Sequence, residues 1–383
     1  MPDLHQMQSD AGAQFIPFGD ESTVIAATFG AYELEYAAIR KGVGVLHLPQ
    51  RGVLRLTGSE ADRRDFLHRL LTQDIRSLRG GATVAALQLN DKGRIVADAT
   101  VHHGDADTWL DLDAVDLPAL HALLDARLFS EDVQVAPIDP PRVTLALLGP
   151  AVLPLLVACG ADSAAAARML QMPGTHHVLQ LADCLVSCYR HDDCAPTAGV
   201  RLLVRAPDAP AVLQRIADAL GGLSPDPAAA VDRDTTKVHG RAVGWLAYNT
   251  ARVEAGWPLF HIDFGPDSLP HELGRRALER RVRFAKGCYL GQEIVARMQN
   301  LGHPKKVLVQ LNCPDDRQPL GGSELFDGSG GGAVVGAVTS SAVSPMRGNA
   351  AVALAVVKWG HHTPGTKLRV PAEGALVEAV VVA

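Results

Sequence analysis

The strongest chemical signal in the sequence is the eight-residue run KGCYLGQE at 286–293. Its two glycines permit backbone conformations that are closed to other residues, so a ligand can approach the main chain closely. Ile294 and Met298 are spaced for one face of a helix, which predicts Cys288 on a tight turn just before a helix N-terminus. That position, beside Lys286, activates a thiol as a nucleophile. The alternative is a glycine-rich turn whose cysteine only packs.

A second candidate group is the carboxylate of Asp98. The apolar residues of 85–101, with a turn at 90–93, predict a β-hairpin, and Asp98 follows the turn on the second strand. A carboxylate among apolar strand residues has either a partner or a function. The alternative is an outward-facing strand charge.

A third candidate begins at Arg252, in the run RVEAG. An arginine near an acid can grip a carboxylate or the polar edge of a heterocycle through bidentate hydrogen bonds. The alternative places Arg252 and Glu254 as exposed neighbours on one strand face, where they form a weak surface pair.

Charge is unevenly spread along the chain. The formal net charge of −6 argues against an overall surface for polyanions. Residues 275–306, however, hold nine basic residues against two acidic ones, a local charge of +7. This cluster surrounds the 286–293 run, where it would attract a ligand with an anionic tail. The alternative is a solvated helix face.

The cysteines and the apolar runs argue for a cytoplasmic protein without a metal site. None of the six cysteines forms a C-x-x-C pair, and on one strand Cys184 and Cys188 would lie roughly 13 Å apart, too far to chelate one ion. The start of the chain lacks a charged-then-apolar leader. The longest apolar stretch, 145–159, is interrupted by glycine and proline, so no membrane span is expected.

The 383 residues are enough for two or three domains. Helical periodicity predicts a helix over 60–71, with Phe66 and Leu70 inward and Arg63 and Arg64 outward. After about residue 304 short β-rich runs alternate with Gly, Pro and Asp, which indicates a small β-barrel. The expected divisions are a loose leader, two successive parts of one α/β region, and the barrel: 1–20, 21–145, 146–300 and 301–383.

The run at 286–293, continued by Ala296 and Arg297, resembles the signature of the YgfZ-type folate-binding proteins, which are relatives of the glycine-cleavage T-protein (aminomethyltransferase). LTQDI at 71–75, NDKGRIVAD at 90–98 and the segment after Arg252 are similar to the same superfamily. The resemblance implies an α+β fold, with a T-protein-like folate-binding region of two mixed α/β domains and a C-terminal small β-barrel.

The resemblance also implies a site. Lys286 and Cys288 would be the reactive residues, and the residues that contact tetrahydrofolate or a one-carbon derivative would be Asp98, Arg252, Glu254, Lys286, Tyr289 and Gln292. Two departures stand out. The T-protein counterpart of Asp98 has two adjacent acids, and Ala97 stands here in place of one. The segment DDCAPTAG offers no clear counterpart of the glutamate that holds the pteridine.

The resemblance implies a tetrahydrofolate-binding accessory protein for iron–sulfur cluster assembly or repair in client enzymes, including tRNA-modifying ones. Its partners would be folate and those clients or cluster-assembly proteins. Whether it turns over a substrate is left open. One alternative is a folate-dependent aminomethyltransferase with a lipoyl carrier. Another is a non-catalytic adaptor for RNA or protein, although direct nucleic-acid binding is not expected without an array of stacking aromatic residues.

Overall fold

The computed structural model describes residues 3–225, 237–314, 316–328 and 332–382. The chain forms two compact units, and each is assembled from separate stretches of sequence. Unit 1 comprises 1–63, 78–84 and 100–251, and unit 2 comprises 64–77, 85–99 and 252–383. The expected division at 145/146 would cut strand β9 (Arg142–Leu148), which is continuous in unit 1.

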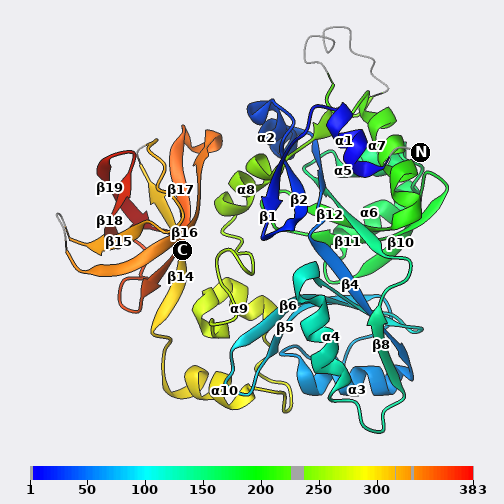
Figure 1. The fold of residues 1–383 in the computed structure, drawn as a ribbon, viewed down its shortest axis with the longest axis horizontal. Coiled ribbons are helices and arrows are strands. Elements are labelled where there is room, and N and C mark those ends of the chain that lie inside the picture. The colour runs from blue at the N-terminus through cyan, green and yellow to red at the C-terminus, as the bar shows by residue number, and fades with distance from the viewer. Residues whose placement is uncertain (1–2, 226–236, 315, 329–331, 383) are drawn as a thin grey trace. The chain divides into compact units, whose positions relative to one another are not determined.

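Unit 1 contains a six-stranded sheet in the order β10-β11-β12-β9-β3-β13. Figure 1 labels three of its strands, β10, β11 and β12. Its pairings are antiparallel except for β13 with β3. Apolar residues of this sheet and of helices α5 (Val152–Ala158), α6 (Ser163–Gln171) and α7 (Ala209–Leu220) form one large buried cluster. The remaining strands of the sheet are β3 (Val43–His47), β10 (His176–Leu181), β11 (Cys184–His191), β12 (Gly199–Arg205) and β13 (Gly240–Ala242).

A second sheet, of five strands, has the order β5-β6-β7-β4-β8. The hairpin of β5 and β6 turns at 90–93, as the sequence predicts, and Gly93 there has φ of 69°. Residues 85–99 of this hairpin belong to unit 2, and the other strands belong to unit 1. The strands are β4 (Arg51–Gly58), β5 (Ala82–Leu89), β6 (Ile95–His103), β7 (Thr108–Asp113) and β8 (Val133–Pro137).

The C-terminal part of unit 2 is a closed six-stranded barrel, which confirms the predicted fold of this region (Figure 1). The apolar run of strand β17 is unbroken because both faces of the strand are buried. Ala351, Ala353 and Ala355 face the barrel core. Val352 and Leu354 pack with Val253 outside the barrel. The strands are β14 (Lys306–Cys313), β15 (Glu324–Asp327), β16 (Val334–Ser344), β17 (Ala350–Lys358), β18 (Lys367–Ala372) and β19 (Ala375–Val381).

Residues 3–20 are not a loose leader. Helix α1 (Leu4–Asp10) begins at Asp3, whose side chain accepts a hydrogen bond from the Gln6 amide at 2.7 Å. Strand β1 (Gln14–Phe18) then pairs with β2 (Asp20–Thr28). The leader expectation was wrong because a seven-residue helix is too short to show periodicity.

The other helices complete the two units. Their lengths leave none among the described residues able to cross a membrane. They are α2 (Tyr32–Lys41), α3 (Glu60–Leu70), α4 (Leu117–Asp125), α5 (Val152–Ala158), α6 (Ser163–Gln171), α7 (Ala209–Leu220), α8 (Trp245–Glu254), α9 (Arg275–Arg281) and α10 (Gln292–Leu301).

Helix α3 corrects one predicted orientation. Arg63 points inward and is 1% exposed, with its guanidinium donating to the carbonyls of Gly104 (2.9 Å), Asp105 (2.8 Å) and Ala106 (3.1 Å). These carbonyls lie in the turn between β6 and β7, where no neighbouring strand donates to them, and the Arg63 guanidinium supplies the donors. The arginine is therefore part of the fold of unit 1 and not of its surface.

Replacing Arg63 tests this assignment. Arg63→Met removes the guanidinium that pairs three part-buried carbonyls and leaves an apolar side chain in its place, so we expect the free energy of unfolding to fall by about 2 kcal/mol. Urea denaturation measures it. The matched control is Arg69→Met on the exposed side of the same helix, which we expect to change stability by less than about 0.5 kcal/mol. Equal effects of the two changes would contradict the assignment.

Candidate functional site

The segment between α9 and α10 carries the run at 286–293, and a buried lysine fixes it in place. Lys286 is 8% exposed, and its ammonium donates to the carbonyls of His68 and Leu71 (2.6 Å for Leu71). These carbonyls lie at the C-terminal end of α3, where the last turn of a helix has no internal donors for its carbonyls. The Leu290 amide adds a hydrogen bond to the Arg69 carbonyl at 3.1 Å. The lysine thus caps one helix and, together with the Leu290 amide, anchors the segment on both sides of Cys288.

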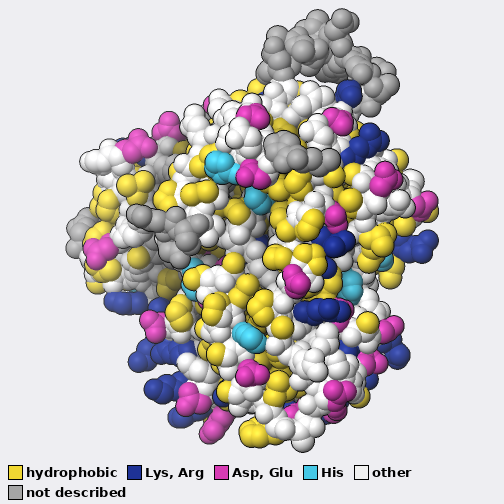
Figure 2. Space-filling view, turned by 45° about the vertical axis from the view of Figure 1, so that its right-hand side comes forward, with side chains coloured by type: hydrophobic (Ala, Val, Ile, Leu, Met, Phe, Trp, Pro, Cys, Tyr) yellow, Lys and Arg dark blue, Asp and Glu magenta, His cyan; other side chains and the backbone are white. Residues whose placement is uncertain are grey.

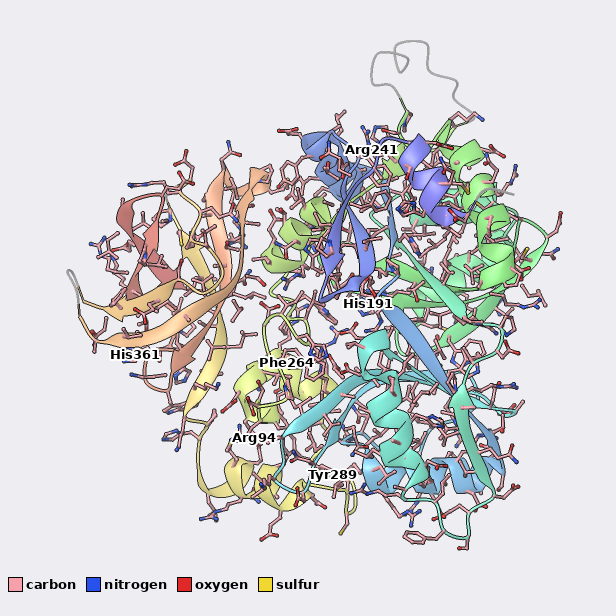
Figure 3. The ribbon with its side chains drawn as sticks, in the orientation of Figure 1. Arg94, His191, Arg241, Phe264, Tyr289 and His361 are labelled. Carbon is pink, nitrogen blue, oxygen red and sulfur yellow. The ribbon has the colours of Figure 1, made fainter. Side chains whose placement is uncertain are left out.

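Burial has a second consequence for this lysine. It lowers the pKa of Lys286 to about 8, because the charged form loses hydration that two carbonyls replace only in part. The ammonium also lies 4.8 Å from the centre of the Tyr289 ring. Burial raises the pKa of Tyr289 to about 12. The residue belongs to a buried apolar cluster that also includes Leu89 and Phe264, and Figure 3 labels both Tyr289 and Phe264. Lys286 and Tyr289 therefore belong mainly to the support of the segment.

Cys288 lies between these two buried residues and is itself exposed. The alternative in which its sulfur only packs is therefore wrong. Helix α10 starts four residues later, at Gln292, whose side-chain oxygen accepts from the Tyr289 amide at 3.3 Å. The thiol sits before the helix as predicted, but not on its first turn.

A glycine is required where the segment enters α10. Gly291 has φ of 80°, and an added Cβ would lie 2.6 Å from the Asn90 carbonyl oxygen at the tip of the β5–β6 hairpin. The hairpin tip approaches from the other side as well, since a Cβ on Gly93 would meet Ile294 at 2.9 Å. Close packing of two backbones therefore accounts for the second glycine of the run.

Asp98 has a partner that the sequence did not reveal. Both of its carboxylate oxygens accept from Arg281, at 2.9 and 2.8 Å, and the arginine side chain is 5% exposed. The Arg281 guanidinium also lies 5.8 Å from the ring centres of Trp257 and Phe264. The outward-facing alternative for Asp98 is wrong. Ala277, Leu278 and Arg281 share the buried face of α9, so helical periodicity could have placed this arginine inward.

Arg252 is fully buried and lies on helix α8. The alternative in which Arg252 and Glu254 are exposed neighbours on a strand is therefore wrong. Its guanidinium donates to Asp263 (2.6 Å), to the Trp257 carbonyl (3.1 Å) and to the Ser340 hydroxyl (2.6 Å). The carboxylate of Glu254 accepts from the Ser344 hydroxyl. Within unit 2, these bonds connect the end of α8 to barrel strand β16.

The other oxygen of Asp263 accepts from the hydroxyls of Thr339 and Ser340, both at 2.7 Å. This buried carboxylate and the Arg252 guanidinium therefore satisfy each other and the strand beside them. The Arg252 guanidinium therefore makes its hydrogen bonds to groups of the protein.

Unit 1 holds a buried acid that sequence reasoning missed, in the segment DDCAPTAG. Asp193 is fully buried, and one of its oxygens accepts from Arg201 at 2.9 Å and from the Tyr248 hydroxyl at 2.8 Å. Burial favours the neutral acid, but His191 and Arg201 hold the pKa of Asp193 well below its usual range. The other oxygen, the Arg201 Nε and the Thr197 hydroxyl have no hydrogen-bond partner. A buried group of this kind is a candidate ligand contact.

The basic cluster at 275–306 is divided between fold and surface. Arg281 and Lys286 are buried, while the Arg275 side chain is 90% exposed and pairs with Glu279. The Arg280 guanidinium lies over the Trp257 ring at 4.6 Å. Figure 2 shows Lys and Arg side chains gathered with acidic ones at the lower left of the view. The local charge is therefore smaller on the surface than the sequence suggests.

The lowered pKa of Lys286 predicts a pH dependence of stability. The unfolded chain, with a lysine pKa of 10.5, binds more protons than the folded chain between about pH 8 and 10.5, so stability rises with pH in that range. We expect the free energy of unfolding of the wild type, relative to Lys286→Met, to rise by about 2 kcal/mol between pH 7 and 9.5. Urea denaturation at the two pH values measures it. Parallel pH profiles would show that the ammonium is not buried.

Comparison with known proteins agrees with the fold. The family of the GCVT N-terminal domain matches residues 4–190, and that of the glycine cleavage T-protein C-terminal barrel domain matches residues 306–383. The crystal structure of glycine cleavage system aminomethyltransferase T from Bartonella henselae superimposes with a TM-score of 0.81 at 21% identity. It covers 99% of this chain and 96% of that one.

Similar sequences extend over the full length. An aminomethyltransferase of Saccharopolyspora erythraea is 26% identical over 99% of this chain and 96% of its own. A probable aminomethyltransferase of Natronomonas pharaonis is 28% identical over 99% of this chain and 97% of its own. The two domain matches, the fold and these relatives agree, and the chain belongs to the glycine-cleavage T-protein superfamily.

Proposed function

We propose that this protein binds tetrahydrofolate, or a one-carbon derivative of it, and transfers an aminomethyl-derived one-carbon unit to it. The observation that carries the proposal is the similarity to aminomethyltransferases from end to end, through both domain families. This favours the folate-dependent aminomethyltransferase over the iron–sulfur accessory role that the KGCY signature suggested.

The buried cluster in unit 1 supports folate binding. An unpartnered oxygen of Asp193 beside the unpartnered Nε of Arg201 suits a ligand that presents a donor and an acceptor on one edge, as the aminopyrimidine ring of a pterin does. We assign Asp193 to hold that edge. It lies in the segment where the family resemblance places the pteridine-binding glutamate.

The proposed roles of the other candidates follow from their partners. Within unit 2 we assign a chemical role to Asp98 and Cys288, because the carboxylate of Asp98 is partly accessible and the thiol of Cys288 is exposed. Lys286, Tyr289, Gln292, Arg252 and Glu254 are assigned to positioning, since each of them makes hydrogen bonds or ring contacts with the protein.

A second function is favoured by two specific observations. Ala97 replaces one of two acids, and the remaining one, Asp98, has both oxygens on Arg281, which disfavours its use as a base. Cys288 is exposed in a motif that resembles the YgfZ-type signature. The second candidate is a folate-binding accessory protein for iron–sulfur enzymes, in which Cys288 acts on a partner.

Folate binding is tested first. We expect calorimetry with 5-formyl-tetrahydrofolate to show saturable binding by the wild type, and binding about tenfold to a hundredfold weaker by Asp193→Asn, which loses a charge-assisted hydrogen bond. The matched control is Asp208→Asn at the end of the surface pair with Arg205, which should bind like the wild type. Thermal unfolding of each variant shows whether it is folded. A wild type that does not bind would refute both functions.

Turnover then separates the two functions. Given an aminomethylated lipoyl carrier and tetrahydrofolate, we expect the wild type to release ammonia and form methylene-tetrahydrofolate. Asp98→Asn should lower the rate by about a hundredfold or more if that carboxylate stabilises the reacting amine. Cys288→Ser should have little effect on this reaction.

The opposite pattern supports the second candidate. It consists of folate binding without turnover, together with rescue of an iron–sulfur enzyme in cells by the wild type but not by Cys288→Ser. Cys184→Ser, at a half-buried strand position, is the matched control for loss of a thiol.

A further inference from the structure

The first glycine of the run at 286–293 is not required by the fold, unlike the second. Gly287 does not have a positive φ, so its backbone conformation is open to other residues. Apart from its two neighbours in sequence, an added Cβ would meet one described heavy atom within 4 Å, the Nε2 of His68 at 3.8 Å. That is an ordinary van der Waals contact. The absence of a side chain at Gly287 therefore leaves open space next to Cys288.

His68 borders this space with a free ring nitrogen. The residue is 6% exposed and lies near the end of α3, in the same unit as the run at 286–293. The Lys286 ammonium donates to its carbonyl, which holds the two segments together. The Nε2 of His68 makes no hydrogen bond with any residue that the structure describes, and unlike the free oxygen of Asp193 it is not sealed from solvent. A buried side chain that directs such an atom into open space indicates a ligand contact.

The surroundings of His68 place a proton on Nε2. The Arg76 amide donates to Nδ1 at 3.3 Å, and because a backbone N–H can only donate, Nδ1 is an acceptor. Asp74 Oδ1 lies 3.2 Å from the same Nδ1, but it accepts from the Ser77 amide at 3.3 Å and so does not require the ring proton. Burial, with the charges of Lys286 and Arg76, lowers the pKa of His68, so the ring is neutral at pH 7 and its one proton is on Nε2.

Two backbone donors adjoin this imidazole. The amides of Gly287 and Cys288 make no hydrogen bond with a described residue, and both residues are exposed. Of the six cysteines, all within the described part of the chain, only Cys288 is exposed. An accessible sulfur therefore lies next to three hydrogen-bond donors, the two amides and His68 Nε2.

The charges near these donors favour an anionic acceptor. With a pKa of about 8, Lys286 is charged at pH 7, and its ammonium lies against the His68 carbonyl. The carboxylate of Asp74 is on the Nδ1 side of the ring, whereas Gly287 is on the Nε2 side. A carboxylate at Nε2 therefore gains charge-assisted hydrogen bonds, which are stronger than those of a neutral acceptor.

We propose that the space beside Gly287 is a subsite for the carboxylate of a small electrophile that reacts with Cys288. The Nε2–H of His68 and the amides of Gly287 and Cys288 donate to this carboxylate. The sulfur forms a bond to the electrophilic carbon, the leaving group departs with the electron pair of its own bond, and the thiol proton goes to solvent. Neither folate nor a lipoyl carrier takes part in this step, so its test is independent of the proposed function.

Alkylation by iodoacetate, with iodoacetamide as the comparison, tests the subsite. The two reagents release the same iodide and differ in a carboxylate against a neutral amide. Mass spectrometry of the peptide that contains Cys288 gives both rate constants at pH 7, in about 0.5 M salt so that the attraction of distant charges is screened. We expect the ratio of the rate constants, iodoacetate over iodoacetamide, to be about tenfold higher for Cys288 than for N-acetylcysteine.

Two variants locate the subsite. Gly287→Ala fills the space without backbone strain and His68→Leu removes the donor, so each should bring the ratio to within about twofold of that of N-acetylcysteine. The matched control is Gly302→Ala at the other end of α10, where φ is −154° and an added Cβ meets no atom within 4 Å, and it should keep the wild-type ratio. Thermal unfolding shows whether each variant is folded. The proposal is overturned if the wild type has the ratio of N-acetylcysteine, or if either Gly287→Ala or His68→Leu keeps the wild-type ratio.

Discussion

The contact between the Lys286 ammonium and the carbonyls at the end of α3 determines how the run at 286–293 is held. The lysine side chain points inward to His68 and Leu71 and is buried, as is Tyr289. Cys288 lies between these two buried residues, and its thiol is exposed. The contact joins residues more than two hundred positions apart in sequence. It is made at a cost, since burial favours loss of the proton, and the carbonyls of an otherwise uncapped helix end compensate for that cost. The run is therefore better understood as a device that presents a cysteine than as a pair of reactive residues.

Much of the fold could be predicted from sequence, because its signals are local. The hairpin at 82–103 has alternating apolar residues about a turn, and the barrel has short β-rich runs between turn residues, so both were found. The errors share a different cause. Arg63 and Arg252 were expected to be exposed or free for a ligand, since a charged residue is usually solvated, and both are buried by partners distant in sequence. No local pattern encodes the Gly104 carbonyl or the Ser340 hydroxyl as such a partner.

The residues of the candidate site also have partners that no local sequence pattern encodes. Sequence reasoning left open whether Asp98 has a partner or a function, and it placed Arg281, the partner that the structure shows, in a basic cluster without a role. It did not find Asp193, because the family resemblance offered no counterpart in that segment. What identifies Asp193 is its environment, with one oxygen bound by Arg201 and Tyr248 and the other unpartnered. Burial and unsatisfied bonding are properties of the folded chain, and only a structure reveals them.

At Asp193 burial is combined with an unsatisfied polar atom, and the charge of that atom decides which ligand it can accept. The free oxygen belongs to a carboxylate, so it favours a ligand that donates, and the adjacent Arg201 supplies a matching donor. A ligand that presents only acceptors would leave the carboxylate oxygen unsatisfied and lose its own hydration. The edge of a ring that carries both a donor and an acceptor meets both requirements, which is the physical reason for proposing a pterin there.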